Sequence, residues 1–251
     1  MYYEYLPDKR LSHLIEVYWI SENFGMSPIV QRILPDGCVD IILSLGSTSR
    51  DSHTNSRHFY IVGTITSYLD VAFQSGKIQM LGIRFRPAGI TAFTRMPIDD
   101  LTNKFIELTL ADTLFEKDFH ERLSDLPTIE ECITKIEHFL ISRLPYAFTP
   151  EKRIESAIDY IRKANGQISV TKIADIACLS ERQLERKFKA VVGISPNKFS
   201  RIIKFKHALN HLRHCPQESL YSAAIDCGYF DHSHLIKDFK KFGGTVPCEL
   251  K

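Results

Sequence analysis

The chain has 251 residues, of which 44% are hydrophobic, so it is long and apolar enough for one large or two ordinary domains. No run of eighteen or more apolar residues occurs, and the N-terminal segment has no basic region followed by an apolar run. We therefore expect neither a membrane span nor a signal peptide, and we expect the protein in the cytoplasm. The six cysteines form no C-x-x-C pair, which favours reduced, buried thiols over disulfides or a zinc site.

The net charge of +2 is the sum of two unlike halves. Residues 150–251 carry 18 Lys and Arg against 11 Asp and Glu, a net charge of +7. Residues 1–149 carry 14 against 19, a net charge of −5. A basic half joined to an acidic half suggests a polyanionic partner for the basic half only.

The first third of the sequence predicts strands. Five runs rich in β-branched and aromatic residues are separated by Gly, Asn, Ser and Pro. They are residues 14–21, 29–46, 57–63, 68–75 and 77–87. The polar stretch 46–58 predicts a mobile loop, and its His53 and His58 lack a third ligand, so no metal site is expected there.

After residue 87 the apolar spacing becomes helical. Helices are predicted over residues 88–95, 99–108, 111–123 and 129–144. The last of these has one apolar stripe, which is either core or a dimer face, and core is the expectation. The stripe comprises Ile129, Ile133, Ile136, Phe139, Leu140 and Leu144. The fold class expected is α+β, with a small barrel-like or sandwich N-terminal domain followed by helices and then an all-α domain.

Two prolines in residues 144–150 predict a domain boundary, which gives an N-terminal domain over 1–145 and a C-terminal domain over 150–251. Thr149 and Pro150 predict the start of a helix that runs to about Ala164. Everything beyond is predicted helical, including two helix-turn-helix units at about 168–190 and 218–242.

The segment from Ser180 to Lys189 predicts a short capped helix. Ser180 is a good N-cap and Gln183 follows three residues later, which makes a capping box. Leu184 and Phe188 share one face, while charged residues occupy another. Such a helix is either an ordinary amphipathic surface helix or one that lies in a DNA major groove.

An internal repeat favours the second alternative. Ala174 matches Ala224 at an offset of fifty, and Cys178 matches Gly228. After the turn the offset is fifty-one, because one residue near Phe230 is inserted. The pairs at this offset are Ser180 with Asp231, Leu184 with Leu235, Phe188 with Phe239, Gly193 with Gly244 and Pro196 with Pro247. Each copy predicts helix, tight turn and capped helix, and the apolar stripe over 195–214 predicts a long helix between the copies.

The strings IADIACLSERQLERKFKAVVGISPNKFSRIIKFKHAL and AAIDCGYFDHSHLIKDFKKFGGTVP closely resemble the DNA-binding domain of the AraC/XylS family. The strings ILPDGCVDIILSLG and GIRFRPAGITAFTRMPIDDLTN resemble, more weakly, an uncharacterised domain found ahead of such domains. The resemblance implies a bacterial one-component regulator that binds double-stranded DNA. Its N-terminal domain would sense a small-molecule effector or form a homodimer, and RNA polymerase would be a further partner. An activator is one possibility and a repressor the other, and no cofactor is expected.

The resemblance also implies roles for individual residues. The base-reading residues would be Arg182, Glu185 and Arg186 in the first recognition helix, and His232, Ser233, His234 and Lys237 in the second. Arginine can donate two hydrogen bonds to guanine, and glutamate can accept one from cytosine. Phosphate contacts are expected from Lys189, Arg201, Lys204, Lys206, Lys240 and Lys241. Asp231 and Asp238 are expected to be cap and surface groups.

The N-terminal half offers an effector pocket on weaker grounds. Its candidate residues are Trp19, Asp36, Cys38, Arg84 and Arg86. Arg84 and Arg86 would either bind an acidic effector or, by default, pair with Asp36 or Asp40. Cys38 is expected to be a small buried residue of a strand rather than a reactive thiol, and Trp19 to be core.

Two other functions remain open. The chain could be a constitutive DNA binder whose first domain only dimerises. It could also be an enzyme of the DNA alkyl-transfer type fused to a DNA-binding domain. That chemistry needs an activated cysteine or a four-cysteine zinc site. Residues 1–149 hold only Cys38 and Cys132, and no catalytic residues are predicted, so we expect no enzyme.

Overall fold

The computed structural model describes residues 1–23, 29–44, 59–73, 78–107, 119, 122–123, 126 and 128–250. The predicted loop 46–58, with its two histidines, and most of the predicted helix 111–123 lie outside these residues. No helix among the described residues combines the length and the apolar character that a membrane crossing requires.

The N-terminal lobe is built on a six-stranded antiparallel sheet with the order β1-β2-β7-β4-β5-β8. Its strands are β1 (Tyr2–Tyr5), β2 (Ile15–Asn23), β4 (Val39–Ser44), β5 (Phe59–Val62), β7 (Ile78–Phe85) and β8 (Phe105–Glu107). A second sheet consists of β3 (Ile29–Ile33) paired antiparallel with β6 (Leu69–Phe73). Residues of both sheets line one cavity, and the predicted α+β class is confirmed.

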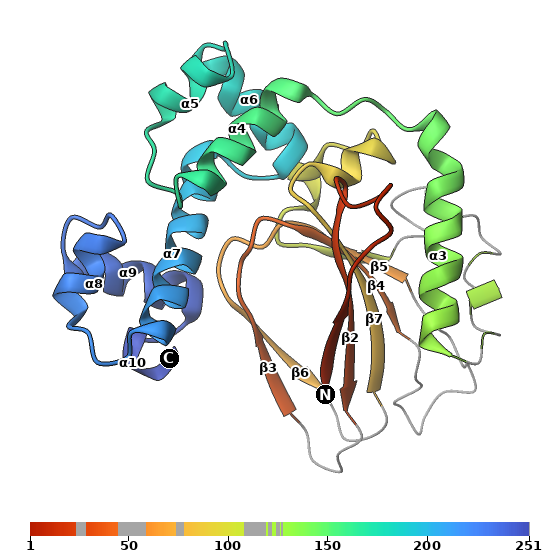
Figure 1. Cartoon of the computed structure of the whole chain (residues 1–251), viewed down its shortest axis with the longest axis horizontal. Coiled ribbons are helices and arrows are strands. Elements are labelled where there is room, and N and C mark those ends of the chain that lie inside the picture. Colours follow the sequence, from red (N-terminus) through yellow and green to blue (C-terminus); the bar gives the residue numbers. More distant parts are fainter. Residues whose placement is uncertain are drawn as a thin grey trace.

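Alternation along the central strands separates two faces of the large sheet. In β4, Val39, Ile41 and Leu43 are buried while Asp40 and Ile42 are half-buried. The buried side packs against α3 (Ile129–Arg143), whose apolar stripe joins the same core. The apolar stripe of α3 therefore lies in the core, as expected, and is not a dimer face. The other side of the sheet faces β3, β6 and the helical lobe (Figure 1).

Several predicted elements of this lobe differ from the structure. Residues 29–46 contain two strands, because Pro35, Asp36 and Gly37 turn the chain between them and Gly37 takes φ 81°. The predicted helices 88–95 and 99–108 are wrong. The chain there forms two 3₁₀ turns, η1 (Gly89–Ala92) and η2 (Ile98–Leu101), and the strand β8. Pairing with β5 determines β8, and three residues are too few to show the period of a strand.

The second lobe is helical throughout. Its elements are α4 (Lys152–Lys163), α5 (Val170–Ile176), α6 (Glu181–Val192), α7 (Pro196–His214), α8 (Leu220–Asp226), α9 (His232–Asp238), the π-helical segment η4 (Phe239–Gly243) and α10 (Pro247–Leu250). The chain reaches this lobe through the short 3₁₀ turn η3 (Leu144–Tyr146). The helix predicted from Thr149 begins at Lys152, and Asn165 and Gly166 end it with positive φ.

The internal repeat is confirmed as two packed units. Ala174 and Ala224 are both buried where the helices of each unit cross. The two turns have left-handed backbones at matching positions, with φ 50° at Cys178 and φ 75° at Gly228. A side chain at Gly228 would also collide with Gln167, whereas Cys178 is exposed. The first turn therefore tolerates a Cβ at some cost in strain, and the second favours glycine because of its positive φ.

Candidate nucleic-acid interface

Helix α6 carries the first set of predicted base-reading residues. Ser180 accepts a hydrogen bond from the Gln183 backbone N–H, and the complete capping box is present. Leu184 and Phe188 are fully buried and fix the helix to its unit. Arg182 and Arg186 are exposed on the outside of the helix. Two guanidinium groups four residues apart on one exposed face can each donate to a base edge.

Glu185 and Lys189 lie on the same helix but are committed to each other. Lys189 Nζ is 3.0 Å from Glu185 Oε1, and both side chains are more than two-fifths exposed. An exposed pair of this kind contributes only about 0.3–0.5 kcal/mol, so it opens readily when another partner is present. This ion pair therefore does not prevent either side chain from contacting another group.

Helix α9 presents a different chemistry. Asp231 caps it by accepting from the His234 backbone N–H, as predicted. His232, Ser233, His234 and Lys237 are all exposed. Next to them lie two exposed aromatic rings. Phe230, which is 84% exposed, packs edge-on against His234, and Tyr221 lies near His232. This surface suits apolar contact with thymine methyl groups and single hydrogen bonds rather than paired contacts to guanine.

The long helix α7 joins the two units. It has 19 residues, close to the predicted 195–214, which corresponds to a length of about 28 Å. Phe199, Ile202, Phe205 and Leu209 of α7 belong to the core that the two units share. Because both recognition helices pack on this common core, their separation is set by a rigid element.

The predicted phosphate-binding residues fall into two groups. Lys189, Lys240 and Lys241 are exposed. Arg201, Lys204 and Lys206 have other neighbours. Arg201 pairs with Asp238, which is buried and is not the surface group that the sequence suggested. Lys204 donates to the Gly228 carbonyl, and Lys206 lines a cavity that faces the N-terminal lobe.

Lys198 was missed by the sequence argument. Burial lowers the pKa of its ammonium group, and the nearby charges of Lys241 and Arg201 lower it further. Three cations from two elements are thus close enough to repel one another. Such a cluster is typical of a phosphate contact, since a bound anion relieves the repulsion. The spacing of Lys198 and Lys241 in the sequence gives no sign of this proximity.

The N-terminal lobe holds the C-terminal end of both recognition helices. Thr64 and Thr102 donate hydroxyl hydrogen bonds of 2.6 Å to the carbonyls of Val192 and Gly193, where α6 ends. Arg32 of β3 donates to the carbonyl of Gly243, at the end of the segment that continues α9. These carbonyls have no partner within their own helix, so the contacts satisfy groups that would otherwise need water.

A cavity of about 720 Å³ lies between the two lobes. Its floor is the half-buried face of the large sheet, and β3 and β6 form one wall. Helix α7 forms the other wall with Lys206, Leu209, Asn210 and Arg213. Trp19 lies across Gly82, where a side chain would overlap its indole ring, so the strand needs glycine at this point.

The charged groups of the cavity floor are arranged as the default prediction expected. Arg84 Nε lies 3.1 Å from an Asp40 oxygen and 3.4 Å from an Asp36 oxygen. Trp19 Nε1 also donates to Asp40. Burial raises the pKa of Asp40 to about 6, although the Arg84 guanidinium opposes the shift. In this network two carboxylates, those of Asp36 and Asp40, share the single guanidinium of Arg84.

Of the other predicted pocket residues, Cys38 and Trp19 line the cavity and Arg86 does not. Cys38 lines the cavity but is buried, and burial raises the pKa of its thiol well above the ordinary value. Such a thiol is a poor nucleophile. Arg86 donates to the Ser12 carbonyl and is not among the cavity residues. Trp19 is buried in the domain and contributes to the cavity wall at the same time.

Comparisons with known proteins agree with this division. Residues 3–107 match the family described as a domain of unknown function (DUF6597), and residues 173–251 match a family described as a helix-turn-helix domain. An uncharacterized HTH-type transcriptional regulator of Haemophilus influenzae is 23% identical over 156 residues, which are 62% of this chain and 52% of that protein. The transcriptional activator RhaS of an Enterobacter species is 31% identical over 88 residues, which are 34% of this chain and 30% of RhaS.

Among solved structures, ToxT from Vibrio cholerae covers 92% of this chain and 96% of its own, with 10% identity and a TM-score of 0.46. A probable AraC family regulator from Rhodopseudomonas palustris covers 39% of this chain and 94% of its own, with 25% identity and a TM-score of 0.36.

The chain thus spans about half or less of the length of the curated relatives named above. Both relatives are named as transcriptional regulators. The motifs, the two packed units and the matched families agree on the domain order: residues 173–251 form a helix-turn-helix domain behind a domain of unknown function over residues 3–107.

Proposed function

We propose that the protein is a sequence-specific transcription regulator that binds double-stranded DNA with α6 and α9 in two successive major-groove segments. The observation that carries the proposal is the attachment of both capped helices to the single rigid helix α7. Two segments of one DNA face are about 34 Å apart, which is close to the length of that helix. Bound at a promoter, the protein would recruit or obstruct RNA polymerase.

The two recognition helices would contribute unequally. Arg182 and Arg186 can each form paired hydrogen bonds with guanine, which discriminate against a wrong base by about 1–3 kcal/mol. Histidine and the neighbouring aromatic rings of the second unit make weaker distinctions. We therefore expect the half of the binding site under α6 to be the more strictly defined one.

Replacement of Arg186 by alanine tests this function. We expect the affinity for the protein's own promoter to fall by about 1–3 kcal/mol, because a base contact is lost. Affinity for unrelated DNA should change much less. Binding would be measured by fluorescence anisotropy at fixed salt, with Lys163→Ala as a control that removes one exposed charge at the end of α4. Equal affinity of wild type and Arg186→Ala for the promoter would contradict the role given to α6.

We further propose that a small-molecule effector binds in the cavity between the lobes and acts on α7. The cavity walls are mostly apolar, and the acidic groups of its floor already share Arg84. Two cations, Lys206 and Arg213, enter from α7. An effector with an apolar body and an anionic group matches this distribution. Arg32, another wall residue, holds the end of the second recognition helix, so a bound molecule would lie beside both α7 and that contact.

A screen of acidic and neutral metabolites by thermal unfolding of the whole chain tests the effector. A true ligand at a hundred times its Kd adds about 2.7 kcal/mol to the free energy of unfolding. The double variant Lys206→Gln and Arg213→Gln should lose most of this gain for an acidic ligand. A constitutive DNA binder would respond to no member of the screen, and an acidic ligand that stabilises both forms equally would place its charge elsewhere.

A further inference from the structure

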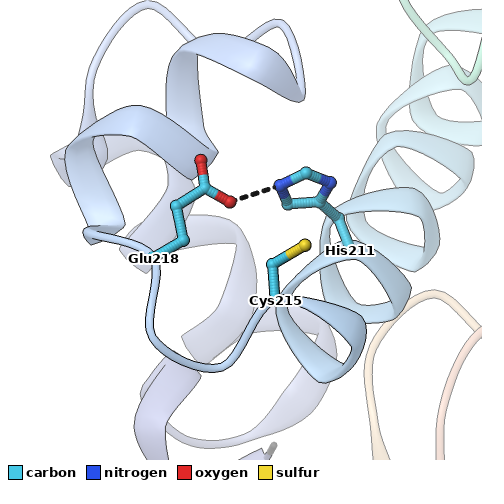
Figure 2. A group of neighbouring side chains, drawn as sticks. All are labelled: His211, Cys215 and Glu218. Atoms are coloured by element: carbon cyan, nitrogen blue, oxygen red, sulfur yellow. Dashed lines mark hydrogen bonds and ion pairs between the residues drawn. The ribbon is translucent and has the colours of Figure 1, made fainter.

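Three side chains with different donor atoms converge where α7 ends. His211 lies in the last turn of α7, Cys215 follows that turn, and Glu218 lies in the loop before α8 (Figure 2). Their imidazole nitrogen, thiol sulfur and carboxylate oxygen all lie within 4.8 Å of one another. His211 Nε2 and Glu218 Oε2 are already 2.6 Å apart.

The local backbone explains the convergence. The Cys215 N–H donates to the His211 carbonyl, so the two residues remain on one side of the helix end. Glu218 returns to the same side because the loop between α7 and α8 is short. Ser219, the next residue, caps α8. The donor set therefore connects the end of the long helix with the start of the second helix-turn-helix unit.

We propose that His211, Cys215 and Glu218 bind one divalent transition-metal cation of the zinc class. Imidazole and thiolate are preferred by Zn²⁺ and its neighbours, whereas Ca²⁺ and Mg²⁺ require six or more oxygen ligands. Ligand bonds of about 2.0–2.3 Å place tetrahedral donor atoms roughly 3.3–3.8 Å apart. To reach this geometry the His211 and Glu218 donor atoms must move apart from 2.6 Å, and the Cys215 sulfur must move closer to them. Side-chain rotations supply these movements. Cys215 is exposed, so water has access to a fourth position.

Metal binding would replace the His211–Glu218 ion pair. The cysteine thiol must lose its proton, and any proton on His211 must also leave, so affinity falls as the pH is lowered. The neighbouring His207 lies one turn earlier on α7, with its ring 6.4 Å from that of His211.

The consequence concerns the second recognition helix. A cation held by residues on both sides of the loop would fix α8, and with it α9, relative to α7. This inference does not rest on the proposed effector or on DNA binding, because the cluster belongs to the helical lobe alone. It would make the geometry of the second unit depend on metal supply.

A cobalt titration of the full, chelator-treated chain tests the site, since Co²⁺ bound by a thiolate gives a charge-transfer band in the near ultraviolet. We expect one equivalent of Co²⁺ to produce the band and Zn²⁺ to abolish it by displacement. Cys215→Ser should lose the band, while Cys178→Ser and Cys248→Ser, which alter the other exposed cysteines, should keep it. A wild-type chain without the band, or a band that survives in Cys215→Ser, would overturn the proposal.

The other two ligands provide a second measurement. His211→Gln and Glu218→Gln should each weaken Zn²⁺ binding at least tenfold in competition with a chromophoric chelator. Circular dichroism of each variant shows whether the helical lobe remains folded. Zinc affinity unchanged in both folded variants would mean that the ion binds elsewhere, and would equally overturn the site.

Discussion

At the scale of single residues, the proximity of three basic side chains makes Lys198 a candidate phosphate-binding residue that its sequence position does not indicate. Lys198 lies at the start of α7 and Lys241 in the segment after α9, forty-three positions apart in the sequence. Arg201 is close to both, although it is also paired with the buried Asp238. A cluster of basic side chains attracts anions. A DNA phosphate is the anion that the proposed function supplies.

A phosphate contact by Lys198 would change the salt dependence of DNA binding. Each phosphate contact releases a counterion, so the slope of log K against log salt concentration changes by about one when a contact is lost. We expect Lys198→Ala to reduce the magnitude of the slope by about one for promoter and unrelated DNA alike. Lys135→Ala, on the exposed side of α3, is the matched control and should leave the slope unchanged. An unaltered slope in Lys198→Ala would remove this residue from the interface.

At the scale of elements, the sequence was informative wherever a pattern repeats. The apolar stripe of residues 129–144 predicted α3 within one residue at its end. Pairs such as Leu184 with Leu235 located both helix-turn-helix units, because each copy confirms the other. Short patterns that occur only once gave wrong predictions of secondary structure. The segment 99–108 contains too few apolar residues to distinguish a helix from a 3₁₀ turn followed by a strand.

Some residues of the candidate site could likewise be predicted from the sequence, and others could not. Exposed arginines on a capped helix follow from helical periodicity, so Arg182 and Arg186 were predictable as neighbours on one face. The hydroxyls of Thr64 and Thr102 were not, because they meet the end of α6 only after two lobes have packed together. Local sequence carries no signal for such contacts. A buried threonine in a β-domain gives no indication of which distant carbonyl it satisfies.

At the scale of the whole molecule, the acidic and basic halves meet around a cavity rather than at a simple interface. The N-terminal lobe contacts the ends of both recognition helices, and the cavity lies along the helix that separates them. A change in the packing of the lobes therefore affects both ends of the DNA-binding surface together. Composition distinguishes the basic half that we propose binds DNA, but gives no sign that α7 also forms a cavity wall.

The buried carboxylate on the cavity floor gives this assembly a predictable pH dependence. The pKa of Asp40 is about 6 in the folded chain and 3.8 when unperturbed, so the folded state holds the proton more tightly. Its contribution to the free energy of unfolding therefore decreases as pH rises from about 4 to about 6, and stays low above that range. The size of this change is on the order of 3 kcal/mol.

Asp40→Asn should remove this decrease in the free energy of unfolding between pH 4 and pH 6. Relative to wild type, the variant should gain stability between pH 4 and pH 7, measured as the difference in denaturant-derived free energies of unfolding. Asp70→Asn is the control, because Arg32 lowers the pKa of Asp70 and its titration lies below this window. The difference between wild type and Asp70→Asn should therefore be flat from pH 4 to pH 7. Parallel curves for wild type and Asp40→Asn would mean that the carboxyl titrates in the folded protein as it does in the unfolded chain.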